Sequence, residues 1–178
     1  MNACSIFILP GWQNSGPLHW QSLWQNQWQA QRVEQHDWMR PLRGDWTIQL
    51  EEAVLAATQP VVLVAHSLGC QLAAAWAAHS RHTDRVKGTL LVAPADGERE
   101  ELRSVLASWS PPVLKPLPFR STVVASSDDP YCSLARSEQF ANAWGSQRVN
   151  VGACGHINAD SGLGDWPQGQ ALLQALMT

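Results

Sequence analysis

Residues 60–70 read Pro-Val-Val-Leu-Val-Ala-His-Ser-Leu-Gly-Cys, and they indicate the class of fold that the chain adopts. A short apolar run ends at Ser67, which has a small residue two positions away on each side, Ala65 and Gly69. An alanine-rich amphipathic segment follows at once, so the pattern predicts a strand, a sharp turn and a helix. Small neighbours are needed because the backbone of a serine at such a turn is strained and the strand and helix approach closely. The stretch therefore predicts a nucleophilic serine.

Similar strand-like runs recur along the chain and alternate with helical patterns. The predicted strands are residues 4–9, 31–35, 60–65, 87–93, 121–126 and 147–152. The predicted helices are residues 17–29, 45–58, 68–81, 134–145 and 167–177. Near-continuous apolar strands that alternate with helices indicate a mostly parallel sheet covered on both faces. The right-handed crossover rule then favours an α/β architecture, a doubly wound sheet of about six strands.

The least regular stretch is residues 94–120, which is rich in proline at its end. Roughly 25 residues between two strands are too few for an independently folded cap, so we expect no lid domain. The segment around residues 99–109 has the pattern of a short helix. The length of 178 residues is suited to one domain over residues 1–178.

Composition excludes several classes of partner. A net charge of −3 with 15% charged residues gives neither a basic field for nucleic acid nor a polybasic membrane patch. No apolar run approaches the ~20 residues of a membrane span. The N-terminal segment lacks a basic region and its apolar run is cut by Pro10 and Gly11, so it is typical of a first strand rather than a signal peptide. We therefore expect a cytoplasmic protein.

A serine hydroxyl becomes a good nucleophile when a base removes its proton and a third group orients that base. Asp128 and Asp129 follow the predicted strand 121–126, at the sheet edge where such folds place their chemistry. Asp129 is the preferred acid because it stands three positions after Ser126, in the place of the final aspartate of the Gly-x-x-Asp pattern that is common after this strand. Asp128 is the alternative. Both could instead cap the helix that begins near residue 134.

The candidate base is His156. It alone of the six histidines lies in the loop after the last predicted strand, behind two glycines that allow a tight reversal. His66 is adjacent to the nucleophile, and we expect it to be structural, with the option of lining the pocket.

An acyl-transfer enzyme also needs donors for the developing oxyanion. The N–H of Leu68, at the start of the helix after the turn, supplies one. The loop after the first strand supplies the other, and there Gly11 permits the turn and the N–H of Trp12 is the candidate.

Ten tryptophans are many for this length, and most of them lie in the first part of the chain. Trp20, Trp24 and Trp28 recur every four residues, which places them along one stripe of a helix. This stripe indicates core packing against the sheet. The alternative is an aromatic wall beside the site, for which Trp12 is the best candidate and Trp20 a further one.

Together these motifs resemble a known family. The matching segments are Pro10-Gly11-Trp12, Ser15 with His19-Trp20, Ala65 to Gly69, Asp128 to Tyr131, Gly155 to Asn158, Ser161 to Gly164 and Trp166-Pro167. The chain resembles the small single-domain serine hydrolases of the α/β-hydrolase superfamily, the group of the bacterial YdeN-type proteins and the animal retinoblastoma-binding serine hydrolase. The resemblance covers essentially the whole chain and implies the α/β-hydrolase fold.

The resemblance also implies site residues. It places the family's catalytic serine, aspartate and histidine on Ser67, Asp129 and His156. Ala65 and Ser126 stand where such proteins commonly have glycine, and both are small enough to be tolerated.

Three further residues of the matching segments have no evident place in a triad. Ser15 is expected to cap the first helix, while His19 and Asn158 are expected to bond loops around the site.

The expected function is that of a carboxylesterase-like serine hydrolase. It would cleave an ester, thioester or related acyl bond of a small substrate. The alternatives are a protein-binding module on a hydrolase fold and an acyltransferase. We expect no cofactor and no metal, because neither ligand spacing nor a phosphate-binding glycine-rich loop is present. The expected partner is a small acyl substrate, with no nucleic acid and no membrane, and a protein partner cannot be read from the sequence.

Overall fold

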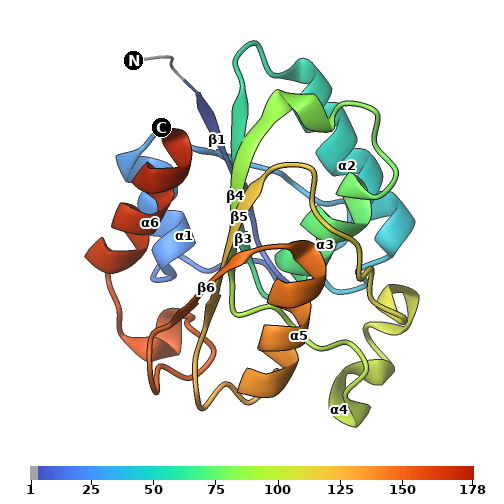
Figure 1. Ribbon diagram of the computed structural model, residues 1–178, viewed down its shortest axis with the longest axis vertical. Helices are drawn as coiled ribbons and strands as arrows, with labels where there is room; N and C mark the ends of the chain where they lie inside the picture. The colour runs from blue at the N-terminus through green and yellow to red at the C-terminus, as the bar shows by residue number, and fades with distance from the viewer. Residues whose placement is uncertain (1–3) are drawn as a thin grey trace.

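The computed structural model describes residues 4–178, in which six parallel strands form one sheet (Figure 1). The strands are β1 (Ser5–Leu9), β2 (Gln31–Arg32), β3 (Val61–His66), β4 (Val86–Val92), β5 (Arg120–Ala125) and β6 (Gln147–Asn150). Their order across the sheet is β2-β1-β3-β4-β5-β6, and every neighbouring pair is parallel. This order confirms the predicted doubly wound α/β sheet, because the chain runs from β1 outward to the edge strand β2, returns to β3 on the other side of β1 and continues to β6 at the opposite edge.

The helices alternate with the strands. They are α1 (Trp20–Gln27), α2 (Arg43–Ala56), α3 (Leu68–Ala77), α4 (Glu100–Arg103), α5 (Leu134–Trp144) and α6 (Pro167–Met177). Three short 3₁₀ turns are η1 (Thr83–Arg85), η2 (Ala107–Trp109) and η3 (Ala159–Ser161). None of the helices within residues 4–178 is long and apolar enough to cross a membrane.

The sheet separates two hydrophobic cores. Helices α1 and α6 cover one face, and α2, α3 and α5 cover the other (Figure 1). Alternate side chains of a strand point to opposite faces, so β1 contributes Phe7 and Leu9 to the core under α2 and α3 and Ile6 and Ile8 to the core under α1 and α6. The central strands are therefore apolar on both faces, which explains their unbroken hydrophobic runs.

Two of the three tryptophans of the predicted stripe pack in the core, and the third, Trp28, is the C-cap of α1 and is half-buried against that core. Trp20 and Trp24 are almost fully buried, and both contact Trp166 at the start of α6. Each indole N–H is satisfied by a main-chain carbonyl, that of Ile157 at 2.8 Å from Trp20 and that of Asp165 at 2.8 Å from Trp24. These bonds fasten the first helix to the last part of the chain.

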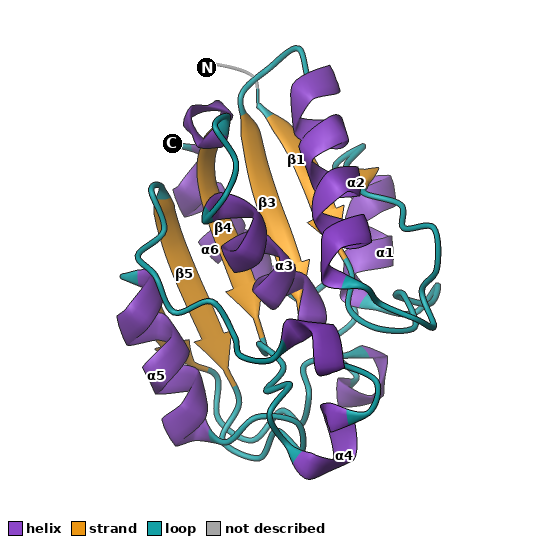
Figure 2. Ribbon diagram, turned by 90° about the vertical axis from the view of Figure 1, so that its right-hand side faces the viewer, coloured by secondary structure: helices purple, strands orange, loops and turns teal. Residues whose placement is uncertain are grey.

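The structure differs from the predicted elements mainly at their ends. β2 is only Gln31–Arg32, because after pairing with β1 over two residues the chain leaves the edge of the sheet. The predicted first helix begins at Trp20 rather than at residue 17, since His19 caps it. The irregular stretch after β4 contains α4 and η2, and Figure 2 shows α4 beyond the carboxyl ends of the strands.

Candidate active site

Ser67 occupies the sharp turn between β3 and α3. Its backbone has φ 56° and ψ −119°, a left-handed conformation that costs a non-glycine residue on the order of 1–3 kcal/mol. The N–H of Ser67 donates to the carbonyl of Val92 at 2.9 Å, and its own carbonyl accepts from the N–H of Cys70 at 3.0 Å. A Cβ on Gly69 would lie 2.2 Å from the carbonyl oxygen of Leu9, so only glycine fits where α3 passes the end of β1.

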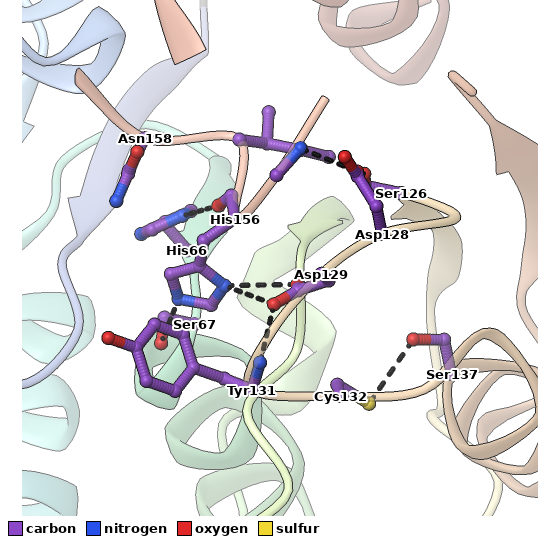
Figure 3. A network of polar contacts seen from close by, with 12 residues as sticks. His66, Ser67, Ser126, Asp128, Asp129, Tyr131, Cys132, Ser137, His156 and Asn158 are labelled. Atoms are coloured by element: carbon purple, nitrogen blue, oxygen red, sulfur yellow. Dashed lines mark hydrogen bonds and ion pairs between the residues drawn. The ribbon is translucent and has the colours of Figure 1, made fainter. Parts of the chain in front are cut away.

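Figure 3 shows the side chains of Ser67, His156 and Asp129 in one hydrogen-bonded line. His156 Nε2 lies 2.9 Å from Ser67 Oγ, and Nδ1 lies 2.9 Å and 3.0 Å from the two carboxylate oxygens of Asp129. An ionised carboxylate only accepts, so Nδ1 carries a proton and Nε2 of the neutral ring accepts from the serine hydroxyl. The side chain of Asp129 is 2% exposed and that of His156 is 9% exposed.

Three separate parts of the sequence supply this line. Ser67 follows β3, Asp129 lies in the loop after β5, and His156 lies in the loop after β6. Because all the strands are parallel, the loops that follow them meet at one edge of the sheet.

Asp128, the alternative acid, makes different contacts. Its carboxylate accepts from the hydroxyl of Ser126 at 2.8 Å and from the N–H of Gly155 at 2.7 Å. These two hydrogen bonds lower the pKa of Asp128 below its ordinary value of 3.8, and the bond from Ser126 has the larger effect. Asp128 therefore ties the loop after β5 to the loop that carries His156.

The idea that these aspartates cap the following helix is wrong. Ser133 is the N-cap of α5, and its hydroxyl accepts from the N–H of Arg136 at 3.2 Å. Asp129 instead accepts from the N–H of Tyr131 at 2.9 Å as well as contacting His156.

His66, beside the nucleophile, is hydrogen-bonded to the main chain of His156. Its Nε2–H donates to the main-chain oxygen of His156 at 2.9 Å, and the two ring centroids are 4.8 Å apart. Burial, followed by the nearby His156 and His19, lowers the pKa of His66 well below its ordinary value of 6.5. His66 is thus a neutral hydrogen-bond donor that also borders the cavity described below.

Two other residues of the motif segments cap short elements. His19, rather than the predicted Ser15, is the N-cap of α1, and its Nδ1 accepts from the N–H of Gln21 at 3.1 Å. Ser15 instead donates to the side-chain oxygen of Gln21 at 2.7 Å. Asn158 caps η3, because its side-chain oxygen accepts from the N–H of Asp160 at 3.1 Å.

Burial sets the charge of His19. Desolvation, followed by the charge of Arg32, lowers the pKa of His19 to about 4. Its ring is therefore neutral at pH 7, with the proton on Nε2 because Nδ1 already accepts a hydrogen bond.

A cavity of about 290 Å³ opens at Ser67. A Cβ on Gly11 would lie 2.8 Å from the Cβ of Ser67, so the loop after β1 passes directly against the nucleophile. Trp12 and Leu68, the two expected oxyanion donors, both line this cavity. Leu68 is the first residue of α3, so its N–H has no partner within the helix.

The structure does not bring Trp20 to the cavity. Its side chain is 1% exposed and lies in the core between α1 and the sheet, where its indole N–H is already bonded. Tyr131, which the sequence reasoning did not single out for the site, packs edge-on against the His156 ring with centroids 4.6 Å apart. Its place directly after the Asp-Asp-Pro turn was the available signal.

Leu102 and Leu106 also line the cavity, and they too were missed. They belong to the irregular segment after β4, whose sequence does not reveal which way its side chains point. Within residues 4–178, no cluster of three or more histidine, cysteine, aspartate or glutamate side chains is arranged to hold a metal ion.

Comparisons with known proteins bear on the family and the fold of the chain. The family described as serine hydrolase matches residues 6–175. A protein described as a YdeN-like hydrolase, from Pectobacterium atrosepticum, is 30% identical, with a TM-score of 0.84 over 98% of this chain and 91% of its own. Among curated proteins there is no match.

Two more distant structures share the fold. The ydeN gene product of B. subtilis is 20% identical, with a TM-score of 0.84 over 98% of this chain and 99% of its own. Est1E from Butyrivibrio proteoclasticus, solved with ferulic acid bound, is 12% identical, with a TM-score of 0.73 over 98% of this chain and 87% of its own.

Proposed function

The chain belongs to the serine hydrolase family, and we propose that it is an esterase-like enzyme that cleaves an ester, thioester or related acyl bond through an acyl-enzyme on Ser67. The observation that carries this proposal is the hydrogen-bonded line from Ser67 through His156 to Asp129. In that line a poor nucleophile has a base at 2.9 Å, and the base has an orienting carboxylate.

Acylation begins at the serine hydroxyl. His156 Nε2 takes the proton of Ser67 as Oγ attacks the carbonyl carbon of the substrate. Asp129 stays ionised and stabilises the imidazolium that forms. The tetrahedral intermediate then collapses, the bond to the leaving group breaks, and His156 gives its proton to that group.

The negative oxygen of the intermediate needs fixed donors. The main-chain N–H groups of Trp12 and Leu68 fill this role, since both residues line the cavity beside Ser67. Deacylation repeats the sequence with water: His156 takes a proton from water, the hydroxide attacks the acyl carbon, and Ser67 leaves with the proton returned by His156. The products are a carboxylic acid and the free enzyme.

The test is active-site labelling combined with kinetics. A fluorophosphonate probe should label Ser67, identified by peptide mass spectrometry, and Ser67→Ala should abolish labelling. The same substitution should lower kcat for p-nitrophenyl butyrate by at least about 1,000-fold.

The matched control is Ser104→Ala, which removes an exposed hydroxyl just after α4. It should keep both labelling and turnover. Turnover that survives in Ser67→Ala, in a protein that retains its circular dichroism spectrum, would refute the proposal.

A further inference from the structure

The cavity at Ser67 has two chemically different sides, which follow from the order of the strands. Ser67 comes after β3, which lies between β1 and β4 in the sheet. The loop after β1 therefore borders Ser67 on one side and the segment after β4 borders it on the other. Within the lining, the β1 side contributes polar residues as well as Trp12, whereas the segment after β4 contributes apolar residues alone.

The β1 side is the polar side: its polar side chains belong to Gln13, Asn14, His19 and Asn158, and they line the cavity together with Trp12. Asn158 belongs to this side because the carbonyl of its neighbour Ile157 is bonded to Trp20 on α1. The Oδ1 of Asn158 already accepts from Asp160, which leaves the amide nitrogen as a donor.

The apolar side consists of Ala95, Leu102 and Leu106. The two leucines are buried, at 6% and 2% exposure, and they lie in the segment of α4 and η2 beyond the strand ends. A site at the lower end of the usual volume of ligand pockets, with a leucine wall, accommodates a short apolar group.

The lining, all of it within residues 4–178, contains no lysine, arginine, aspartate or glutamate. The ionised side chains that adjoin residues of the lining are bonded to other groups of the protein. Arg32 donates to Asn14 Oδ1 and to the carbonyl of Ser15, Asp129 is bonded to His156, and Asp96 is paired with Arg136. His19 and His66 are neutral, since burial lowers both pKa values. A charged acyl group against the leucine side would therefore lose water without gaining a counter-charge from the lining.

The position of the base orients the substrate. His156 must reach the leaving group to protonate it, and Asn158, two residues beyond His156 in the same loop, lines the same cavity. The leaving group therefore belongs on the polar side, which leaves the leucine side for the acyl group.

We propose that the substrate carries a short, uncharged, apolar acyl group that lies against Leu102 and Leu106, and a leaving group that lies beside Asn158 and His19. This inference rests on the proposed hydrolase function. It makes Leu102 and Leu106 the residues that set acyl-chain length.

The first experiment needs no variant. Three p-nitrophenyl esters of butyrate carry, in place of one hydrogen of the terminal methyl group, a neutral tert-butyl, a cationic trimethylammonium or an anionic sulfonate group of similar size. We expect kcat/KM for each charged ester to be about 100-fold below that of the neutral one, because its charge is desolvated without a partner. Equal kcat/KM for the neutral ester and either charged ester would overturn the inference.

The second experiment varies chain length. Leu106→Ala should raise the ratio of kcat/KM for p-nitrophenyl octanoate over acetate by about 10-fold, because the wall recedes. The control is Leu114→Ala, which truncates a leucine that is 48% exposed and outside the lining. It should leave the ratio unchanged.

A series of alkyl butyrates, which varies the alcohol instead, should respond little to Leu106→Ala. A response confined to the alcohol series would refute the orientation. These outcomes are distinct from failure of the proposed function, in which no ester is turned over and no probe labels Ser67. Should Leu106→Ala not fold, Leu102→Ala tests the same wall.

Discussion

The Nε2–H of His66 donates a hydrogen bond to the main-chain oxygen of His156 across 2.9 Å. The residue that precedes the nucleophile thus holds the backbone of the base, while the nucleophile itself contacts the ring of that base. The separation between Ser67 and His156 is therefore set twice, once through the side chains and once through the main chain. This makes His66 a positioning residue.

Replacing His66 should separate this role from simple packing. His66→Leu leaves the buried carbonyl of His156 without its donor, which lets the loop of the base shift. We expect kcat to fall about 10- to 100-fold with little change in KM. His66→Gln, whose amide can donate to the same oxygen, should recover most of kcat. Equal losses in the two variants would argue against the positioning role.

The two neighbouring aspartates should behave differently. Asp129→Asn replaces the carboxylate that orients His156, and kcat should fall about 1,000- to 10,000-fold because the amide favours the wrong tautomer. Asp128→Asn is the matched control, since an amide oxygen can still accept from Ser126 and Gly155. Its kcat should stay within about 10-fold of the unaltered enzyme. A larger kcat loss in Asp128→Asn than in Asp129→Asn would reverse the assignment of the acid.

The contact between Gly11 and the nucleophile can be tested with a single methyl group. In Gly11→Ala the new Cβ would lie 2.8 Å from the Cβ of Ser67, so the loop that carries the N–H of Trp12 must move away. Loss of one oxyanion donor lowers kcat by about 100- to 1,000-fold, and we expect a value in that range. Gly16→Ala, in the same loop, meets nothing within 4 Å and should keep kcat. Similar kcat for the two variants would show that Trp12 supplies no donor.

Much of this arrangement could be predicted from the sequence because its signals are local. Each of these signals can be recognised from a few neighbouring positions. They are the apolar run before Ser67, the small residues Ala65 and Gly69, and the aspartates directly after the fifth strand. The doubly wound arrangement followed from general rules of chain connection. The family and the fold are accordingly the parts of the prediction that the structure and the comparisons confirm.

The parts that could not be predicted depend on contacts between distant segments. Ser15 was the predicted cap of the first helix, but its hydroxyl donates a hydrogen bond to the side chain of Gln21, and His19 is the N-cap instead. Trp20 is an aromatic residue of a type that often lines pockets, yet its indole N–H donates a hydrogen bond to the carbonyl of Ile157, which is 137 positions away. Leu102 and Leu106 lie in an irregular stretch whose side-chain directions are fixed only by tertiary packing.

A carboxylate far from the site should control stability at acidic pH. Burial alone would raise the pKa of Glu51, but hydrogen bonds from Ser80, His82 and Trp76 together outweigh it and lower this pKa below its ordinary value of 4.5. A folded-state pKa below the unfolded value adds stability that is present above pH 4.5 and is lost as the pH falls below it.

The check is urea unfolding of the unaltered protein and of Glu51→Gln. The unaltered protein should have the higher free energy of unfolding at pH 6, and this difference should shrink between about pH 4.5 and pH 3. A difference that stays constant over this range would rule out the linkage. Glu52→Gln, which alters an exposed neighbour on the same helix, should follow the unaltered protein at every pH.

The strand order divides the sheet into two contiguous parts, with β1 to β4 on one side of the β4–β5 ladder and β5 and β6 on the other. Ser67 and the Gly11–Trp12 loop belong to the first part, whereas Asp129 and His156 belong to the second. Residues 93–119 join the two parts, and the end of this segment, residues 110–118, is rich in proline and exposed or half-buried. If the chain were cut within residues 110–118, one fragment would hold Ser67 and the other Asp129 and His156. Ester cleavage would then require the two fragments to associate, and its rate would report how much of the complex had formed.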